Sequence, residues 1–453
     1  MRTAWRCVRV AAPIVIGLGL LASAGVWAWQ VYSAPSDGSQ ATAAGYGQFL
    51  LALVGALALT GQGLLAWWRR QRVRQVSTPE QVGAAADRLA QEMTVFWTDQ
   101  VAARGIQTPA PVRVRWEWAG DDVAPDRQEV NRSPSLGTDP LPLPGGAPGE
   151  VLSSGLVTRL HDQVYARLRH GRLVLIGGPG AGKTGAMILL MLEALHHHRR
   201  QVLDGQRARE PVPVWLTLGS WNPNEQTLRD WVAATLAQNC SYLCAVDFGP
   251  DAITGLLDGG RVALFLDGLD EMPDRLRPRA LQRLAGEAAG LRVVLTSRPG
   301  EYRAALQDGE GLPYPAVVDL QPVGPPAAAE YLLEGRTGSS RQLWQQVADR
   351  LQADPGGVLA QVLTTPLALS LARAVGPDPS WLLSPQPATG QALRDQLWDQ
   401  ALVTAYPDQR ERDHATSWLA WIAHHMNTRP GGPTRDLAWW HIPTWTLSTP
   451  GQN

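Results

Sequence analysis

The segment RLVLIGGPGAGKT, residues 172–184, restricts the possible folds of this chain more than any other. The branched apolar run at residues 173–176 is typical of a central parallel strand that is buried on both faces. A glycine-rich loop follows, and Lys183 and Thr184 then open the helical stretch GAMILLMLEALHHH. This order of strand, loop and helix is the context in which the pattern G-x-x-x-x-G-K-[ST] forms a phosphate-binding P-loop. We therefore expect an α/β fold with a parallel sheet.

The chemistry of the loop follows from its residue types. Glycines let the backbone N–H groups turn toward a phosphate, and the positive end of the following helix adds to the attraction. Lys183 is the only lysine in a chain that otherwise uses arginine, and its compact ammonium suits the β- and γ-phosphates of ATP or ADP better than a broad guanidinium does. Thr184 is expected to ligate Mg²⁺. The predicted nucleotide-binding loop comprises Gly177, Gly178, Pro179, Gly180, Ala181, Gly182, Lys183 and Thr184.

Acidic residues follow a second apolar run. The segment RVALFLDGLDE contains a predicted buried strand that ends at Asp267. We expect Asp267 to hold Mg²⁺ as the Walker B residue. Asp270 and Glu271 lie just beyond it, and either could orient or deprotonate an attacking water molecule. The alternative is that these acids cap the next helix.

A further strand, LRVVLTSRP, ends at Arg298. An arginine at a strand end near the phosphates would sense the γ-phosphate and stabilise charge in the transition state, which makes Arg298 a catalytic candidate. The alternative is a surface salt bridge. Strands that alternate with helical segments favour a doubly wound sheet with its ligand at the carboxyl ends of the strands. We interpret His196 to His198 as cations near the end of the P-loop helix rather than as metal ligands.

Two uncharged stretches near the N-terminus, residues 10–32 and 48–68, are long enough to cross a bilayer as helices. Arginines precede the first and follow the second, whereas the loop between them has no positive charge. The positive-inside rule then predicts a multi-pass cell-membrane protein with its NTPase domain in the cytoplasm. A cleavable signal peptide is the alternative for the first stretch, and a buried core helix is the alternative for both.

Composition limits the remaining choices. The net charge is −1, so no basic excess points to nucleic acid, and three cysteines cannot form a disulfide framework. We expect a transmembrane hairpin at 1–75, then an amphipathic helix, a short strand and a Pro/Gly-rich linker at 76–150, then a P-loop NTPase domain at 151–322, and finally a helical region at 323–453.

The motifs GGPGAGKT, FLDGLDE and LTSRP, in this order and spacing, resemble those of the NACHT family of STAND-class P-loop ATPases. LTTPLALSLA is similar to the family segment whose proline, here Pro366, lies near the adenine. The resemblance covers roughly 150–430 and extends to membrane-attached bacterial members. It implies a NACHT domain, then helical and winged-helix-like parts.

The resemblance also implies a function. ADP would lock a closed form and slow ATP hydrolysis would reset a signalling switch, often one used in antiphage defence. It implies ATP-dependent self-association and a protein trigger or effector, in addition to the membrane as a partner. A remodelling or transport motor and a non-hydrolysing nucleotide-binding scaffold are the alternatives. We find no transporter-type LSGGQ loop between the P-loop and Asp267.

Overall fold

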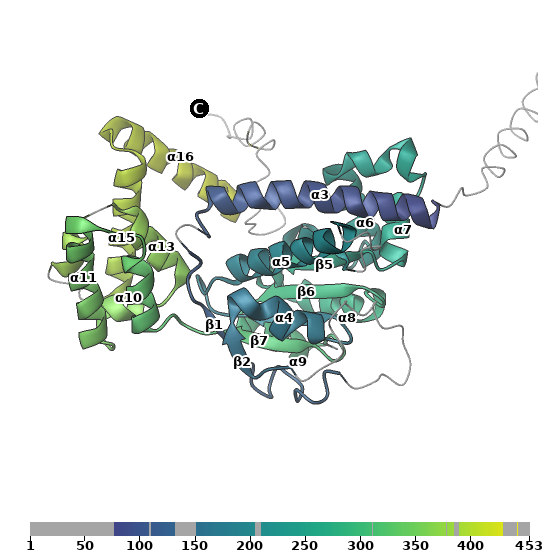
Figure 1. The fold of residues 1–453 in the computed structure, drawn as a ribbon, viewed down its shortest axis with the longest axis horizontal. Coiled ribbons are helices and arrows are strands. Elements are labelled where there is room, and N and C mark those ends of the chain that lie inside the picture. Colours follow the sequence, from purple (N-terminus) through teal and green to yellow (C-terminus); the bar gives the residue numbers. More distant parts are fainter. Residues whose placement is uncertain are drawn as a thin grey trace, which may run out of the picture. The chain divides into compact units, whose positions relative to one another are not determined.

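The computed structural model describes residues 77–107, 110–131, 151–203, 210–309, 311–376, 378–384, 389–428 and 442. A seven-stranded sheet in the order β2-β1-β7-β3-β6-β5-β4 forms the core of this part of the chain (Figure 1). Its strands are β1 (Arg115–Trp118), β2 (Ser154–Leu156), β3 (Arg172–Ile176), β4 (Val212–Thr217), β5 (Val262–Asp267), β6 (Arg292–Ser297) and β7 (Ala316–Leu320). Strands β3 to β7 pair in parallel, and β3 lies between β6 and β7.

The sheet is mixed, which corrects the prediction of a parallel one. β1 pairs antiparallel with both β7 and β2, and Glu117 lies opposite Asp319 in the register with β7. Strand β1 comes from the segment 76–150, which we predicted to hold an amphipathic helix, a short strand and a linker before the NTPase domain. The alternating pattern of VRVRWEW indicated a strand, but its partner β7 lies almost two hundred residues away in the sequence and carries no local signal.

The predicted membrane hairpin also requires correction. Both predicted spans, residues 10–32 and 48–68, lie outside the described residues. Within the part of the chain that the structure describes, no helix combines the length and the apolar character needed to cross a bilayer. The fold class is therefore α/β with a mixed sheet, and neither the transmembrane hairpin nor the multi-pass membrane localisation is retained.

Helix α3 (Pro79–Ala103) packs against α5 (Lys183–Leu203), α7 (Ala252–Asp258) and β4. Thr78 and Gln81 form a capping box at its start. Phe96 is half exposed, whereas Trp97 is buried, with its ring 4.8 Å from that of Trp215 on β4. Leu89 and Val101 lie on the same buried face as Trp97, so α3 is part of the core.

Helices connect the parallel strands, and a helical region follows β7 (Figure 1). Helix α4 (Leu160–Gln163) lies between β2 and β3 in the sequence, and the α-helices that connect the parallel strands are α5, α6 (Leu228–Asn239), α7, α8 (Arg277–Glu287) and α9 (Pro299–Gln307). The helical region contains α10 (Pro325–Leu333), α11 (Gly338–Ala353), α12 (Val358–Val362), α13 (Pro366–Ala374), α14 (Ser380–Leu383), α15 (Gly390–Ala405) and α16 (Gln409–Asn427). Helix α10 packs against α11 and α13, and α15 packs against α12 and α13.

The burial of Trp97 gives a test of how α3 contributes to stability. Truncation of a buried tryptophan leaves a cavity, so we expect Trp97→Ala to lower the free energy of unfolding by about 3 kcal/mol. Phe96→Ala, one residue earlier on the exposed side, is the matched control and should cost under about 1 kcal/mol. Urea denaturation followed by circular dichroism measures both. Equal effects of the two variants would contradict the packing of α3 described here.

Candidate functional site

The P-loop lies at the carboxyl end of β3. Four of the five residues of β3 are buried, as expected for a strand flanked by two others. Gly180 and Gly182 adopt φ angles of +73° and +92°, which L-residues with a side chain rarely adopt. Helix α5 begins at Lys183, and the backbone N–H of Ala186 donates to the carbonyl of Gly182 at 2.8 Å. The loop and the start of the helix thus form one turn with its N–H groups at the helix N-terminus.

The Lys183 side chain contacts the P-loop, and the Thr184 side chain contacts the end of β5. The Lys183 ammonium donates to the carbonyl of Gly177 at 2.8 Å and to that of Gly178 at 3.3 Å. The Thr184 hydroxyl donates to Oδ2 of Asp267 at 3.4 Å. These contacts join the P-loop to the end of β5, two strands away in the sheet.

Asp267 is held by the neighbouring strand β6. The Thr296 hydroxyl donates to Oδ1 of Asp267 and accepts a hydrogen bond of 2.9 Å from the backbone N–H of Gly268. Burial raises the pKa of Asp267, and the nearby Asp270 carboxylate raises it further, while Thr296 and Lys183 act in the opposite direction. Because burial disfavours the ionised form of this carboxyl, a cation placed beside it would stabilise that form.

The acidic turn after β5 contacts Arg298. Nε of Arg298 lies 2.9 Å from Oδ2 of Asp270, whose side chain is only 5% exposed. The more distant Glu301 lies 3.9 Å from the same guanidinium. Arg277 steadies the turn because it donates to the backbone carbonyl of Asp270 at 2.9 Å. Glu271 follows in the same turn, with its carboxylate close to Cα of Gly268, where an added Cβ would lie 3.0 Å from it.

Pro366, at the start of α13, brings the helical region to the P-loop. A Cβ on Gly182 would lie 3.1 Å from the Pro366 ring, and one on Gly180 would lie 3.5 Å from the Thr365 hydroxyl. Thr365 also caps α13, since its hydroxyl accepts from the backbone N–H of Ala368. Glycine at 182 is therefore required both by its φ angle and by the close approach of the proline.

A cavity of about 570 Å³ opens between these groups, a volume in the range of cofactor sites. Of the residues predicted from the sequence, its lining includes Pro179, Gly180, Ala181, Gly182, Lys183, Thr184, Asp267, Asp270, Glu271, Arg298 and Pro366. Gly177 and Gly178 of the loop do not line the cavity, and their carbonyls accept from Lys183. The structure thus brings the predicted residues of three motifs and of α13 to one place.

The apolar wall of the cavity was missed by the sequence motifs. It comes partly from the segment after α3 and partly from α10 and α13, and its members include Ile106, Pro111, Val112, Val114, Val157, Tyr331 and Leu367. Leu367 lies in LTTPLALSLA, but the other positions carry no nucleotide-binding motif, because apolar residues that line a pocket look like core residues in a sequence. An apolar wall opposite a phosphate loop suits a ligand with one charged end and one flat, weakly polar end.

Comparisons with known proteins add no assignment: no protein-family model matches the chain, and no curated protein matches it. The resemblance to NACHT ATPases therefore remains a prediction from the motifs, and the argument for function depends on the geometry of the cavity.

The strained conformation of the P-loop can be tested without a ligand. Gly182→Ala places a side chain at a φ of +92° and against the Pro366 ring, so we expect a loss of about 1–2 kcal/mol in the free energy of unfolding. Gly185→Ala, three residues later within α5 and with open space around the added methyl, should instead gain up to about 1 kcal/mol. Chemical denaturation of both variants measures the difference, and the same sign for both would contradict this geometry.

Proposed function

We propose that the chain binds ATP and ADP with Mg²⁺ and hydrolyses ATP slowly, as a nucleotide-dependent switch of the NACHT kind. The observation that carries the proposal is the convergence of Lys183, Thr184 and Asp267 at one end of the sheet, with the Thr184 hydroxyl 3.4 Å from the Asp267 carboxylate. In this arrangement the P-loop N–H groups and Lys183 would bind the β- and γ-phosphates.

The oxygen atoms of Thr184 and Asp267 fit Mg²⁺, a hard cation that prefers oxygen ligands and retains several water molecules. Thr184 would bind it directly and Asp267 through water. When bound, the ion would neutralise charge on the phosphate oxygens. Thr296 contributes by orientation, because its hydroxyl fixes one oxygen of Asp267 and leaves the other directed toward Thr184.

The acidic pair divides naturally into two roles. Asp270 is nearly buried and lies against Arg298, so we assign it the positioning of that guanidinium toward the phosphates. Arg298 would then stabilise negative charge on the γ-phosphate oxygens. Glu271 also lines the cavity and is our candidate for the residue that orients the attacking water and accepts its proton.

Contact between the P-loop and α13 supports a switch. Gly182 lies against Pro366, and the cavity is lined by the sheet domain on one side and by Tyr331, Pro366 and Leu367 of the helical region on the other. A nucleotide held between two parts of a chain can favour one arrangement of them by binding it more tightly. We propose that ADP favours the arrangement described here and that ATP favours another, which self-associates or engages a protein partner.

Release of bound nucleotide tests the first step. The full chain is denatured and the released nucleotide identified, and affinity for Mg-ATP is measured by calorimetry. We expect bound ADP in the unmodified protein and at least about 100-fold weaker ATP binding in Lys183→Ala, because a charge-assisted contact to phosphate is lost. Arg200→Ala, which removes an exposed positive charge from the far end of the same helix, should bind normally. A protein free of nucleotide that turns over ATP rapidly would instead indicate a motor.

Turnover separates the roles of the acidic residues. We expect Glu271→Gln to lower the rate of ATP hydrolysis about 100-fold or more, and Arg298→Ala to lower it to a similar extent while ADP affinity changes little. Asp270→Asn should lower the rate less, and it should have no further effect in the Arg298→Ala background, because it acts through that arginine. Full activity of Glu271→Gln together with inactivity of Asp270→Asn would reverse the assignment. Nucleotide binding without detectable turnover in the unmodified protein would indicate a scaffold, and unchanged turnover in all three variants would contradict these assignments.

A further inference from the structure

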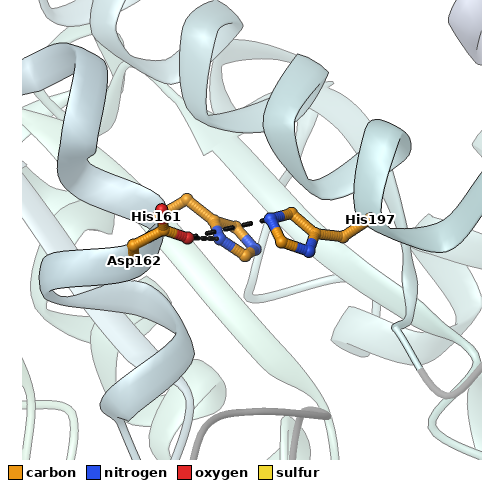
Figure 2. A group of neighbouring side chains, drawn as sticks. All are labelled: His161, Asp162 and His197. Carbon is orange, nitrogen blue, oxygen red and sulfur yellow. Dashed lines mark hydrogen bonds and ion pairs between the residues drawn. The ribbon is translucent and has the colours of Figure 1, made fainter. Parts of the chain in front are cut away.

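Three potential metal ligands converge at the opposite end of helix α5 from the P-loop. His161 and Asp162 come from α4, and His197 comes from the last two turns of α5 (Figure 2). Nδ1 of His161 lies 2.9 Å from Oδ1 of Asp162, and Nε2 of His197 lies 3.7 Å from the same oxygen. The three ligand atoms all lie within 4.8 Å of one another.

These separations suit a single small cation. In a tetrahedral zinc site with bonds of 2.0–2.2 Å, ligand atoms lie about 3.3 Å apart, between the two distances measured here. The imidazoles of His161 and His197 stack, with centroids 4.3 Å apart, so the His197 ring must turn about its Cβ–Cγ bond to aim its lone pair at the ion. His197 is one-third exposed and Asp162 more than half exposed, which permits this rotation and gives solvent access for the ion.

A buried carboxylate supports His161 from behind. Nε2 of His161 lies 3.3 Å from Oε1 of Glu210, and both side chains are almost fully buried. A histidine that binds a metal through one nitrogen commonly donates its other N–H to a carboxylate, which fixes the ring and strengthens the ligand. Asp162 and Glu210 together also place two carboxylates around one imidazole, a surplus of negative charge that a divalent cation would balance.

We propose that His161, Asp162 and His197 bind one Zn²⁺ ion, with water in the fourth position. This ion would link α4 to the C-terminal end of α5. Two imidazoles and a carboxylate suit zinc, whereas Mg²⁺ and Ca²⁺ prefer oxygen ligands alone. Among the described residues, no further histidine, cysteine or acid joins the three. The site does not depend on the proposed ATPase function. His197 is the fourteenth residue after Lys183, which places the zinc site and the P-loop about 21 Å apart along α5.

The three neighbouring histidines of α5 have different environments, contrary to the common role that the sequence suggested for them. His198 is buried, with Nδ1 2.7 Å from the backbone carbonyl of Glu210 and Nε2 3.3 Å from Asp87 of α3. His196 is exposed and does not belong to the group of three ligands. Of these three histidines, only His197 belongs to the group with His161 and Asp162 of α4, so His196 is a matched control for it.

The full chain, treated with a chelator and then dialysed, tests the site with Zn²⁺ alone and without nucleotide. We expect one equivalent of zinc to bind and to raise the unfolding temperature, and Co²⁺ to give the intense visible absorption of a tetrahedral site. His197→Gln and Asp162→Asn should weaken zinc binding at least 100-fold, and Glu210→Gln about 10- to 100-fold. His196→Gln and Asp267→Asn should bind zinc as the unmodified protein does.

Two results would overturn the site. The first is a folded, unmodified protein that binds no zinc at concentrations up to a millimolar. The second is equal zinc affinity in the His196→Gln, His197→Gln and Asp162→Asn variants, since the ion would then bind elsewhere. The two ligand variants alter partly exposed side chains, and circular dichroism confirms that they are folded before zinc is added.

Discussion

The hydroxyl of Thr296 provides the contact on which the nucleotide site depends most. It joins the ends of β5 and β6, because it donates to Asp267 and accepts from the N–H of Gly268. Asp267 is partly buried, and because burial raises its pKa, such a partner helps it to remain ionised and correctly directed. The other carboxylate oxygen of Asp267 accepts a hydrogen bond from Thr184 at the start of α5. The buried Thr296 hydroxyl therefore helps to fix the ends of β5 and β6 relative to α5, the helix that follows β3. A valine at position 296 would keep the packing of this side chain but remove the hydrogen bond that orients the Asp267 carboxylate.

Several parts of this site could be predicted from the sequence because their signals are local. A branched apolar run that ends in glycines and Lys183 specifies a strand, a loop and a helix within a few residues. Asp267 ends one buried strand and Arg298 directly follows another, and parallel strands present their carboxyl ends at one edge of a sheet. The resemblance implied only that Pro366 lies near the adenine, and no local pattern in the sequence indicated its proximity to Gly182.

Other features depend on contacts that a single sequence does not display. β1 pairs with β7, which lies about two hundred residues later in the sequence. The antiparallel direction of this pair depends on the path of the chain between the two strands and not on the residues of β1. The apolar wall of the cavity and the group formed by His161 and His197 likewise combine segments whose residues carry no pattern individually. The predicted membrane spans rested on the length of two uncharged stretches and on the arginines that flank them, and the described structure contains no helix of that character.

The position of β4 has a consequence for how the protein can be shortened. β4 is the last strand on its side of the sheet and pairs only with β5, and α3 packs against it through Trp97 and Trp215. A chain cut at residue 150 would keep every nucleotide motif and yet lose this cover. It would present an apolar strand and the uncovered surface of α5 to solvent, which favours pairing with strands of other molecules. The cut also removes β1, the partner of β7 and β2. Aggregation of such a fragment would therefore reflect a missing helix and a missing strand and would say nothing about its ability to bind ATP.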